Sequence, residues 1–357
     1  MSTALMEGFS PQELPQRTPS FEDCISLAAS EVSSRPLAFL LDWDTVRFVY
    51  QQCLPQATRS GCPIEVYMDR LTGLLVTAKR FPREQAGGRL QAMQEGLQEG
   101  GPCGLEAAWP ELVLTQRLGR QGLAGVCACF GAFHDNRGDV LLVTEFIPGG
   151  DLFDLAIGLG KAGPEREKLA LPVIRSLLHT VLRLHSCGVA HCDVSLENAL
   201  RRADGEVVLI DFETSVTGSA CRRTGVRGKP SYQAPEMYSS ESWDAFAADL
   251  FACGVSAYCL AVGTYPWKST KPGLCRRFAF YQRFGFRTFL RKRGVAEGPG
   301  AWRPGDAYLS PALAELLEVL LHPDPTTRRK AMESLCRRQA PLATGESLPT
   351  AGICSRA

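Results

Sequence analysis

Three polar side chains in the middle of the chain have types and spacings that could do chemistry. Asp193 stands five positions before Asn198, and Asp211 stands 13 positions after Asn198, directly behind the apolar run 207–210. Carboxylate and amide oxygens can bind a hard metal ion, and a carboxylate can accept a proton from a hydroxyl group. The connection from Asn198 to Asp211 is long enough for a hairpin, so we expect these three side chains to meet at one site.

Four segments match the motifs of one family in order and spacing. They are residues 76–79 for V-A-I-K, 191–198 for H-R-D-x-x-x-x-N, 211–213 for D-F-G and 234–236 for A-P-E. The chain therefore resembles the eukaryotic protein kinases from about residue 60 to about residue 335. The resemblance implies ATP and Mg²⁺ as cofactors and a protein hydroxyl as the acceptor.

The resemblance also implies how the phosphates of ATP are held. Lys79 would hold the α- and β-phosphates. A buried ammonium group needs an anionic partner that fixes its direction, and we expect Glu111, on the helix that follows, to be that partner. Glu106 is the weaker alternative.

The three central side chains receive distinct roles from the resemblance. Asp211 and Asn198 would bind Mg²⁺, a cation that prefers oxygen ligands. Asp193 would orient the substrate hydroxyl and accept its proton.

The remaining nucleotide contacts are expected from the hinge, the gatekeeper position and the strands above the nucleotide. Glu145 and Ile147 belong to the expected hinge, 145–147, and Thr144 stands at the gatekeeper position. Gly61, Val66 and Ala78 are the expected contacts from above the nucleotide. Thr144 could equally be an ordinary strand residue, since threonine is common in strands.

The Gly-rich loop of the family is degraded in this chain. Residues 59–66 align with G-x-G-x-x-G-x-V, and Gly61 is the one glycine of the motif that survives there. Pro63 removes a backbone donor and Ile64 adds bulk, which predicts weak nucleotide affinity, although Arg59 could add a phosphate contact.

Two substitutions alter the catalytic and metal motifs. Cys192 replaces the arginine that pairs with an activation-segment phosphate in the family, which predicts activity without such phosphorylation. We interpret Cys192 as a buried, inert thiol, with redox control as the alternative. Glu213 replaces the glycine of D-F-G, and we expect its carboxylate to point to solvent, with a position near the metal as the alternative.

A serine and a lysine have exchanged their usual places. Ser195 stands where Ser/Thr kinases carry a lysine, and Lys229 stands where they carry a threonine. These two groups meet beside the catalytic aspartate in the family. We therefore assign Ser195 and Lys229 to the catalytic set, with Lys229 reaching toward Asp193 or the γ-phosphate; the alternative is a solvated lysine on a loop.

Two supporting features also match the family, and the second of them favours a protein kinase over small-molecule phosphotransferases. Asp249 resembles the aspartate that anchors the catalytic loop from below. Glu236 and Arg328 resemble an ion pair that related small-molecule phosphotransferases usually lack.

The elements that must position these residues follow from hydrophobic periodicity. Alternation over residues 64–81 around a turn at 71–73 predicts a β-hairpin, and residues 82–104 read as containing a loop. A helix is expected over 109–118, and two further strands over 130–133 and 140–146. Later segments predict helices at 168–185, 246–262, 278–291 and 313–321, and a strand at 207–210.

Strands dominate the first part of the chain and helices the second, which predicts an α+β fold with two lobes. We expect a disordered tail over residues 1–40, a small β-rich lobe with one key helix over 45–145, a larger helical lobe over 146–338 and a disordered tail over 339–357.

Composition excludes several classes of protein. Lys and Arg number 39 and Asp and Glu number 38, so no basic excess points to nucleic acid or to a membrane surface. The apolar run 250–263 is shorter than the roughly 20 residues that span a bilayer. Scattered cysteines and no evident secretory signal predict a cytoplasmic protein, and we expect a monomer.

Two functions of different classes remain open. The retained polar residues favour an active kinase that transfers the γ-phosphoryl group to serine or threonine. The degraded Gly-rich loop, Cys192 and Glu213 favour a pseudokinase that acts as a scaffold or regulator. Metal-dependent phosphoryl transfer distinguishes the two.

Overall fold

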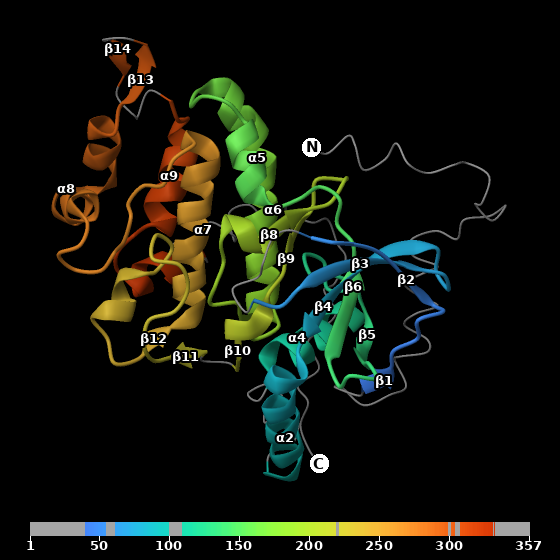
Figure 1. The fold of residues 1–357 in the computed structure, drawn as a ribbon. Coiled ribbons are helices and arrows are strands. Elements are labelled where there is room, and N and C mark those ends of the chain that lie inside the picture. The colour runs from blue at the N-terminus through green and yellow to red at the C-terminus, as the bar shows by residue number, and fades with distance from the viewer. Residues whose placement is uncertain are drawn as a thin grey trace, which may run out of the picture.

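The computed structural model describes residues 40–54, 61–99, 109–218, 221–298, 301–303, 308–330 and 332. Figure 1 shows two lobes, one built on a β-sheet from the first part of the chain and one built mainly of helices from the second part. The predicted α+β architecture is confirmed. The tails predicted to be disordered lie outside the described residues, apart from residue 40 at the start of the first strand.

A six-stranded sheet forms the first lobe, in the order β1-β5-β6-β4-β3-β2. Neighbouring strands are antiparallel except for β1 and β5, which run parallel. The strands are β1 (Leu40–Asp42), β2 (Phe48–Cys53), β3 (Ile64–Asp69), β4 (Leu74–Phe81), β5 (Cys129–His134) and β6 (Val140–Glu145). The predicted hairpin over 64–81 and the two later strands are confirmed.

The two faces of this sheet have different neighbours. Along β4, Val76 and Ala78 face an outer cluster that contains Phe48 and Phe133. Thr77 and Lys79 alternate with them and face inward, because successive strand residues point to opposite faces. The alternation therefore decides which residues of β4 can reach a site under the sheet.

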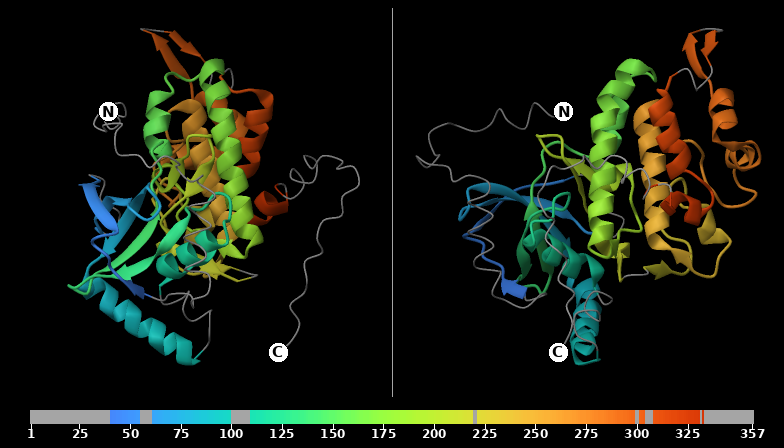
Figure 2. Two further views of the ribbon diagram at one scale, coloured as in Figure 1. Left: turned by 90° about the vertical axis from the view of Figure 1, so that its right-hand side faces the viewer. Right: turned by 180° about the vertical axis from the view of Figure 1, so that it is seen from behind.

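Helices α2 (Arg83–Glu99) and α4 (Pro110–Arg120) cover the inner face. The helix predicted over 109–118 is confirmed as α4. Helix α2, which protrudes below the sheet in Figure 2, was not predicted; it occupies most of the stretch 82–104 that was expected to contain a loop, and residues 100–104 of that stretch lie outside the described residues. Ala86 and Met93 of α2 are buried in one cluster with Trp109, and this packing outweighs the helix cost of Gly87 and Gly88.

Five helices with both ends described, and a further helical stretch at 325–330, shape the described part of the second lobe, and all predicted helices in this region are confirmed. The five are α5 (Leu152–Gly158), α6 (Pro164–Ser186), α7 (Ala245–Val262), α8 (Arg276–Lys292) and α9 (Pro311–Leu320). α5 was not predicted, and α8 is interrupted at Gly285, whose φ of 78° and ψ of 169° are not helical.

Helix α7 is the core of this lobe. Among the described residues it is the one helix long and apolar enough to cross a membrane by length and composition, yet 94% of it is buried inside the fold. Asp244 caps its first turn by accepting a hydrogen bond from the backbone N–H of Ala247. The expectation of a buried core helix is confirmed.

Short strand pairs connect the helices and carry the polar motifs. The pairs are β7 (Val189–Ala190) with β10 (Val216–Thr217), β8 (Ala199–Arg201) with β9 (Val207–Leu209), β11 (Arg222–Arg223) with β12 (Trp243–Asp244), and β13 (Val295–Gly298) with β14 (Ala301–Arg303). The β8–β9 hairpin follows Asn198 and precedes Asp211, as the spacing of these residues predicts.

Candidate active site

Lys79 is the centre of a buried charge cluster between the two lobes. Its Nζ atom lies 2.6 Å from Oε1 of Glu111 and 3.3 Å from Oδ1 of Asp211. The three residues come from β4, from the first turn of α4 and from the segment after β9. Glu111, rather than the alternative Glu106, is the described partner of Lys79, since Glu106 lies outside the described residues.

Burial and charge act in opposite directions on this cluster. Burial lowers the pKa of the Lys79 ammonium, but the carboxylates of Glu111 and Asp211 outweigh it, so the pKa is raised and the ammonium stays charged. Burial raises the pKa of Glu111 to about 7, and the neighbouring carboxylate of Asp211 adds to this against the attraction of Lys79. The single ammonium group of Lys79 therefore balances the carboxyl groups of both Glu111 and Asp211.

The catalytic loop brings Asp193 and Asn198 together. The Asn198 amide nitrogen donates to the backbone carbonyl of Asp193 at 2.9 Å and to its Oδ2 atom at 3.0 Å. The short 3₁₀ turn Leu196–Asn198 brings the amide back to the carboxylate. Both bonds use the amide nitrogen, so the amide oxygen is the atom suited to bind a cation.

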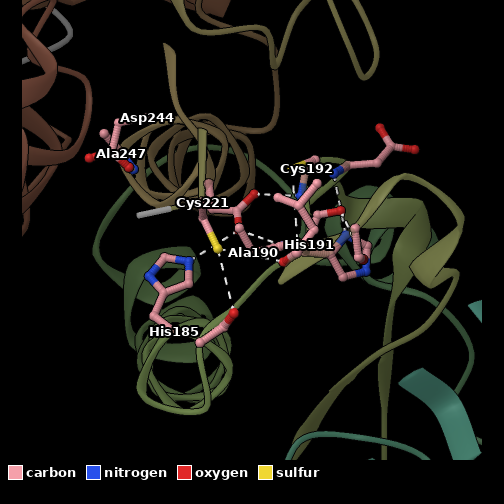
Figure 3. A network of polar contacts seen from close by, with 12 residues as sticks. His185, Ala190, His191, Cys192, Cys221, Asp244 and Ala247 are labelled. Carbon is pink, nitrogen blue, oxygen red and sulfur yellow. Dashed lines mark hydrogen bonds and ion pairs between the residues drawn. The ribbon is translucent and has the colours of Figure 1, made fainter. Parts of the chain in front are cut away.

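Asp249 of α7 holds this loop from below. Its carboxylate accepts from the backbone N–H groups of His191, at 2.7 Å, and Cys192, at 2.8 Å, and its Oδ2 atom lies 3.1 Å from Nε2 of His185. Figure 3 shows His185, His191 and Cys192 in this network of polar contacts. Cys192 has a φ of 63°, which is uncommon for a non-glycine residue. The two carboxylate bonds hold this backbone in place, in the position that the sequence predicted for Asp249.

Cys192 is buried against the same carboxylate. Burial raises the pKa of its thiol well above the ordinary value, and the charge of Asp249 adds to the shift. The thiol is therefore protonated at neutral pH, which favours the interpretation of an inert buried cysteine.

An elongated pocket runs between the lobes from Lys79 to the hinge. Its lining includes Thr144, Glu145 and Ile147, as the sequence predicted, together with Lys79, Glu111 and Asp211. We call β3 and β4, which contribute Ile64, Thr77 and Lys79 to the lining, together with the adjoining residues 61–63, the roof. We call residues 191–202 with β9 and Asp211 the floor; Glu197, Leu200, Leu209 and Asp211 line the pocket, whereas Asp193 and Asn198 are not among its lining residues.

The predicted roof residues lie in three different places. Gly61 has a φ of 67°, which favours glycine, and turns the chain toward β3. Val66 is buried opposite Thr77 on the inner face, but Ile64 is the residue of β3 that lines the pocket. Ala78 belongs to the outer cluster and does not line the pocket, which corrects the prediction for this residue.

Thr77, two positions before Lys79 on the same face of β4, was not predicted as a site residue. Thr77 lines the pocket, and its hydroxyl donates to the backbone carbonyl of Glu145 at 3.2 Å. Alternation along β4, counted back from Lys79, is the signal that could have found it. Leu200 and Leu209 on the floor were missed for the same reason, since each stands two positions from a predicted metal ligand.

The Glu145 side chain holds the hinge rather than facing a ligand. Its Oε1 atom accepts from the backbone N–H of Ala128 at 3.0 Å, and the carboxylate pairs with Arg202 of the floor. The backbone N–H of Glu145 donates to the carbonyl of Ala128 at 3.0 Å, and Glu145, Phe146 and Ile147 all line the pocket.

The exchanged pair Ser195 and Lys229 meets as predicted. Lys229 Nζ donates to Ser195 Oγ at 2.8 Å and lies 3.0 Å from Oε2 of Glu197. Gly228 lies so near the catalytic aspartate that a Cβ atom on it would be 3.2 Å from Oδ1 of Asp193. Ser195 and Glu197 therefore hold Lys229, which does not fit a freely solvated loop lysine, and its reach toward Asp193 or the γ-phosphate stays a prediction.

Glu213 does not point freely to solvent, contrary to the preferred expectation. Its Oε1 atom lies 2.5 Å from Nη2 of Arg89 on α2. Carboxylate oxygens of Glu111, Asp211 and Glu213 lie within 4.8 Å of one another. The alternative interpretation, a carboxylate near the metal motif, describes its position better.

Glu236 and Arg328 form the predicted ion pair. Both side chains are buried, and Arg328 also donates to the backbone carbonyl of Ala247 at 3.0 Å. The pair ties the A-P-E motif to the first turn of α7.

The donor set suits ATP and Mg²⁺. Asp211 and Asn198 offer a carboxylate and an amide oxygen from opposite ends of one hairpin, and such hard oxygen donors are those Mg²⁺ prefers. Lys79, held by two carboxylates, supplies a fixed positive charge for a phosphate group.

Comparison with known proteins identifies the family. The sequence matches the protein kinase domain family over residues 74–338. CBL-interacting protein kinase 29 of Oryza sativa subsp. japonica is 29% identical over 271 residues, which cover 75% of this chain and 54% of that protein. CBL-interacting serine/threonine-protein kinase 17 of Arabidopsis thaliana is 33% identical over 143 residues, covering 39% of this chain and 32% of that protein. The chain spans about half or less of the length of these relatives.

Proposed function

This chain belongs to the protein kinase family, and we propose that it transfers the γ-phosphoryl group of ATP to a serine or threonine hydroxyl of a protein, with Mg²⁺. The family generally uses this nucleotide and this metal. The observation that carries the proposal is the joined ion pairs of Lys79 with Glu111 and Asp211 in the pocket, next to a loop on which Asn198 is hydrogen-bonded to Asp193 and accepts from the backbone N–H of Ile210. The names of similar plant kinases support a serine/threonine acceptor.

Binding of the nucleotide would use both lobes. Lys79 would hold the α- and β-phosphates, and its two carboxylate partners restrict the ammonium to one position. Asp211 and Asn198 would hold Mg²⁺, which neutralises phosphate charge when bound. Hinge backbone groups near Glu145 and Ile147 would face the adenine. Phosphoryl transfer depends mostly on such positioning and electrostatics.

Transfer itself would depend on Asp193. Its carboxylate, held by the amide nitrogen of Asn198, would orient the acceptor hydroxyl and receive its proton. We propose that Lys229 supplies positive charge beside this carboxylate. Its contact with Ser195 and the closeness of Gly228 to Asp193 support that role.

Transfer of labelled γ-phosphate from Mg·ATP to the protein itself and to myelin basic protein tests the function. We expect incorporation on serine or threonine, and a loss of about 10²–10⁴-fold in Asp193→Asn. Incorporation no higher than in Asp193→Asn, with Mg²⁺ and with Mn²⁺, would overturn the proposal in favour of the pseudokinase.

A reciprocal exchange tests the role of Lys229. Lys229→Ala should lose transfer but keep ATP binding, and the double variant Ser195→Lys/Lys229→Thr should recover part of the lost rate. Wild-type rates in Lys229→Ala would contradict the role. Failure of the double variant to exceed Lys229→Ala would assign the lysine to the structure of the loop alone.

We also propose a cytoplasmic, monomeric protein. Each cysteine of the described residues is a free thiol, which supports a reducing compartment. Cell fractionation and light scattering of the purified chain test these two points.

A further inference from the structure

Glu213 stands where the family carries a glycine, and it faces α2 rather than solvent. Its carboxylate meets Arg89, which is also placed with its guanidinium carbon 5.5 Å from the centre of the Trp109 ring. Trp109 is fully buried and directly precedes α4. Arg89 therefore contacts both the segment that carries Asp211 and the start of the helix that carries Glu111.

These contacts form a closed loop that passes through Lys79. Trp109 packs edge-on against Phe81 with ring centres 5.0 Å apart, and Lys79 Nζ lies 5.4 Å from the centre of the Phe81 ring. Lys79 then pairs with Asp211, two positions before Glu213. Four separate parts of the chain, α2, β4, the start of α4 and residues 211–213, are thus fixed to one another.

Charge balance explains why Arg89 is needed. Carboxylate oxygens of Glu111, Asp211 and Glu213 lie within 4.8 Å of one another, and like charges at this distance repel. Lys79 lies against the first two, and Arg89 lies against the third. Loss of Arg89 would leave one ammonium facing three carboxylates, and the backbone could relieve the repulsion by moving Asp211.

The backbone at Asp211 needs to be held. Its φ of 68° and ψ of 70° are in the left-handed region, which a non-glycine residue adopts at a cost. Phe212, the next residue, is buried with its ring centre 5.1 Å from that of His191. The ion pair on one side of this segment and the ring contact on the other hold Asp211 in position without any phosphate on the activation segment.

We propose that Arg89 and Glu213 form a latch that positions Asp211 and the start of the activation segment for nucleotide binding. The latch rests on the proposed function, and it replaces the phosphate-dependent contact that Cys192 cannot make. Both are positioning residues. Their side chains are about 30% exposed, so the energetic effect is moderate and the charge arrangement is open to mutation.

A charge exchange tests the latch. Arg89→Glu should lower kcat/KM for ATP by about three- to tenfold, mostly through KM, since it adds a fourth carboxylate to the cluster. The double variant Arg89→Glu/Glu213→Lys should recover to within about twofold of wild type. Arg287→Glu, which breaks a more exposed pair with Glu318 between α8 and α9, serves as the charge-reversal control and should leave kcat/KM unchanged.

Hydrogen exchange separates the latch from the catalytic proposal. Amides of residues 212–217 should exchange faster in Arg89→Glu, return to wild-type protection in the double variant and stay unchanged in Arg287→Glu, whether or not the chain transfers phosphate. Wild-type protection and KM in Arg89→Glu would overturn the latch, and so would a double variant that resembles the single variant. If the chain transfers no phosphate but the amides of the variants exchange as predicted, the kinase activity is rejected and the latch is retained.

Discussion

The roof and the floor of the pocket are built on different principles. The floor acts through side chains, since Asp193, Asn198 and Asp211 each make a specific polar contact and Asp249 holds two backbone amides. The roof adds Lys79 and Thr77 through their side chains and Ile64 through an apolar contact, whereas its Gly-rich segment belongs to a motif that acts through backbone groups. A surface made of side-chain chemistry tolerates few residue changes, whereas a surface made of backbone tolerates many. The floor therefore retains its motif while the Gly-rich loop of the roof has lost most of its glycines.

Removing Asp249, which anchors the floor, should give the largest loss of stability and of phosphoryl transfer. Asp249→Ala leaves the buried N–H groups of His191 and Cys192 without their acceptor, so we expect a loss of about 2–5 kcal/mol in the free energy of unfolding and no transfer. Chemical denaturation and the transfer assay measure both. Asp244→Ala, which removes the cap of the same helix, should cost only about 1 kcal/mol. Equal losses in the two variants would show that the floor does not depend on this anchor.

Substitution at Gly149, where the hinge meets β8 of the floor, should have the next largest effect on stability and on ATP binding. A Cβ atom at Gly149 would lie 1.9 Å from the backbone oxygen of Arg201, so Gly149→Ala must displace the hinge or β8. We expect a stability loss of about 1–3 kcal/mol and weaker ATP binding, measured by denaturation and calorimetry. Gly88→Ala, at an open position inside α2, should instead stabilise the chain slightly. Unaltered ATP binding in Gly149→Ala would contradict the close approach.

A change in the roof should have a smaller effect. Gly61→Ala meets no atom within 4 Å but must adopt a φ of 67°, so we expect KM for ATP to rise by less than about tenfold. Gly73→Ala has a similar φ of 72° in the distant turn between β3 and β4, and it should lose comparable stability without a change in KM. A rise of a hundredfold in Gly61→Ala would show that the roof is as demanding as the floor.

The smallest expected effect is the reaction of Cys192 with an alkylating reagent. Because its thiol is buried and its pKa is raised, iodoacetamide at pH 8 should leave it unmodified in the native protein while the exposed Cys53 and Cys187 react. Mass spectrometry of the peptides measures this. Labelling of Cys192 at the rate of Cys187 would reopen the redox interpretation.

The same contrast explains what the sequence could predict. Floor residues were found because their motif fixes both residue type and spacing. The structure places Asp211 with Lys79 and Glu111 in the lining of one pocket, and it joins Asn198 to Asp193 by a hydrogen bond. Roof residues were found only in part, since a degraded motif gives no register and Ala78 was taken for its neighbour Thr77.

Two features were beyond reach of the sequence for physical reasons. α2 forms because Ala86 and Met93 find a partner in Trp109, and such tertiary packing leaves a weak local signal in a stretch that contains two adjacent glycines. Arg89 and Glu213 are 124 positions apart, and no motif links them. Spatial proximity of this kind becomes visible only in the folded chain.

The all-round burial of α7 has a consequence for heated protein. A helix that is apolar on every side is soluble only while the second lobe surrounds it, and its 18-residue stretch has the hydropathy of a membrane span. Once the lobe opens, this surface offers every other unfolded chain a site for association. We therefore expect heat inactivation to end in irreversible aggregation, with an apparent Tm that depends on scan rate and on protein concentration.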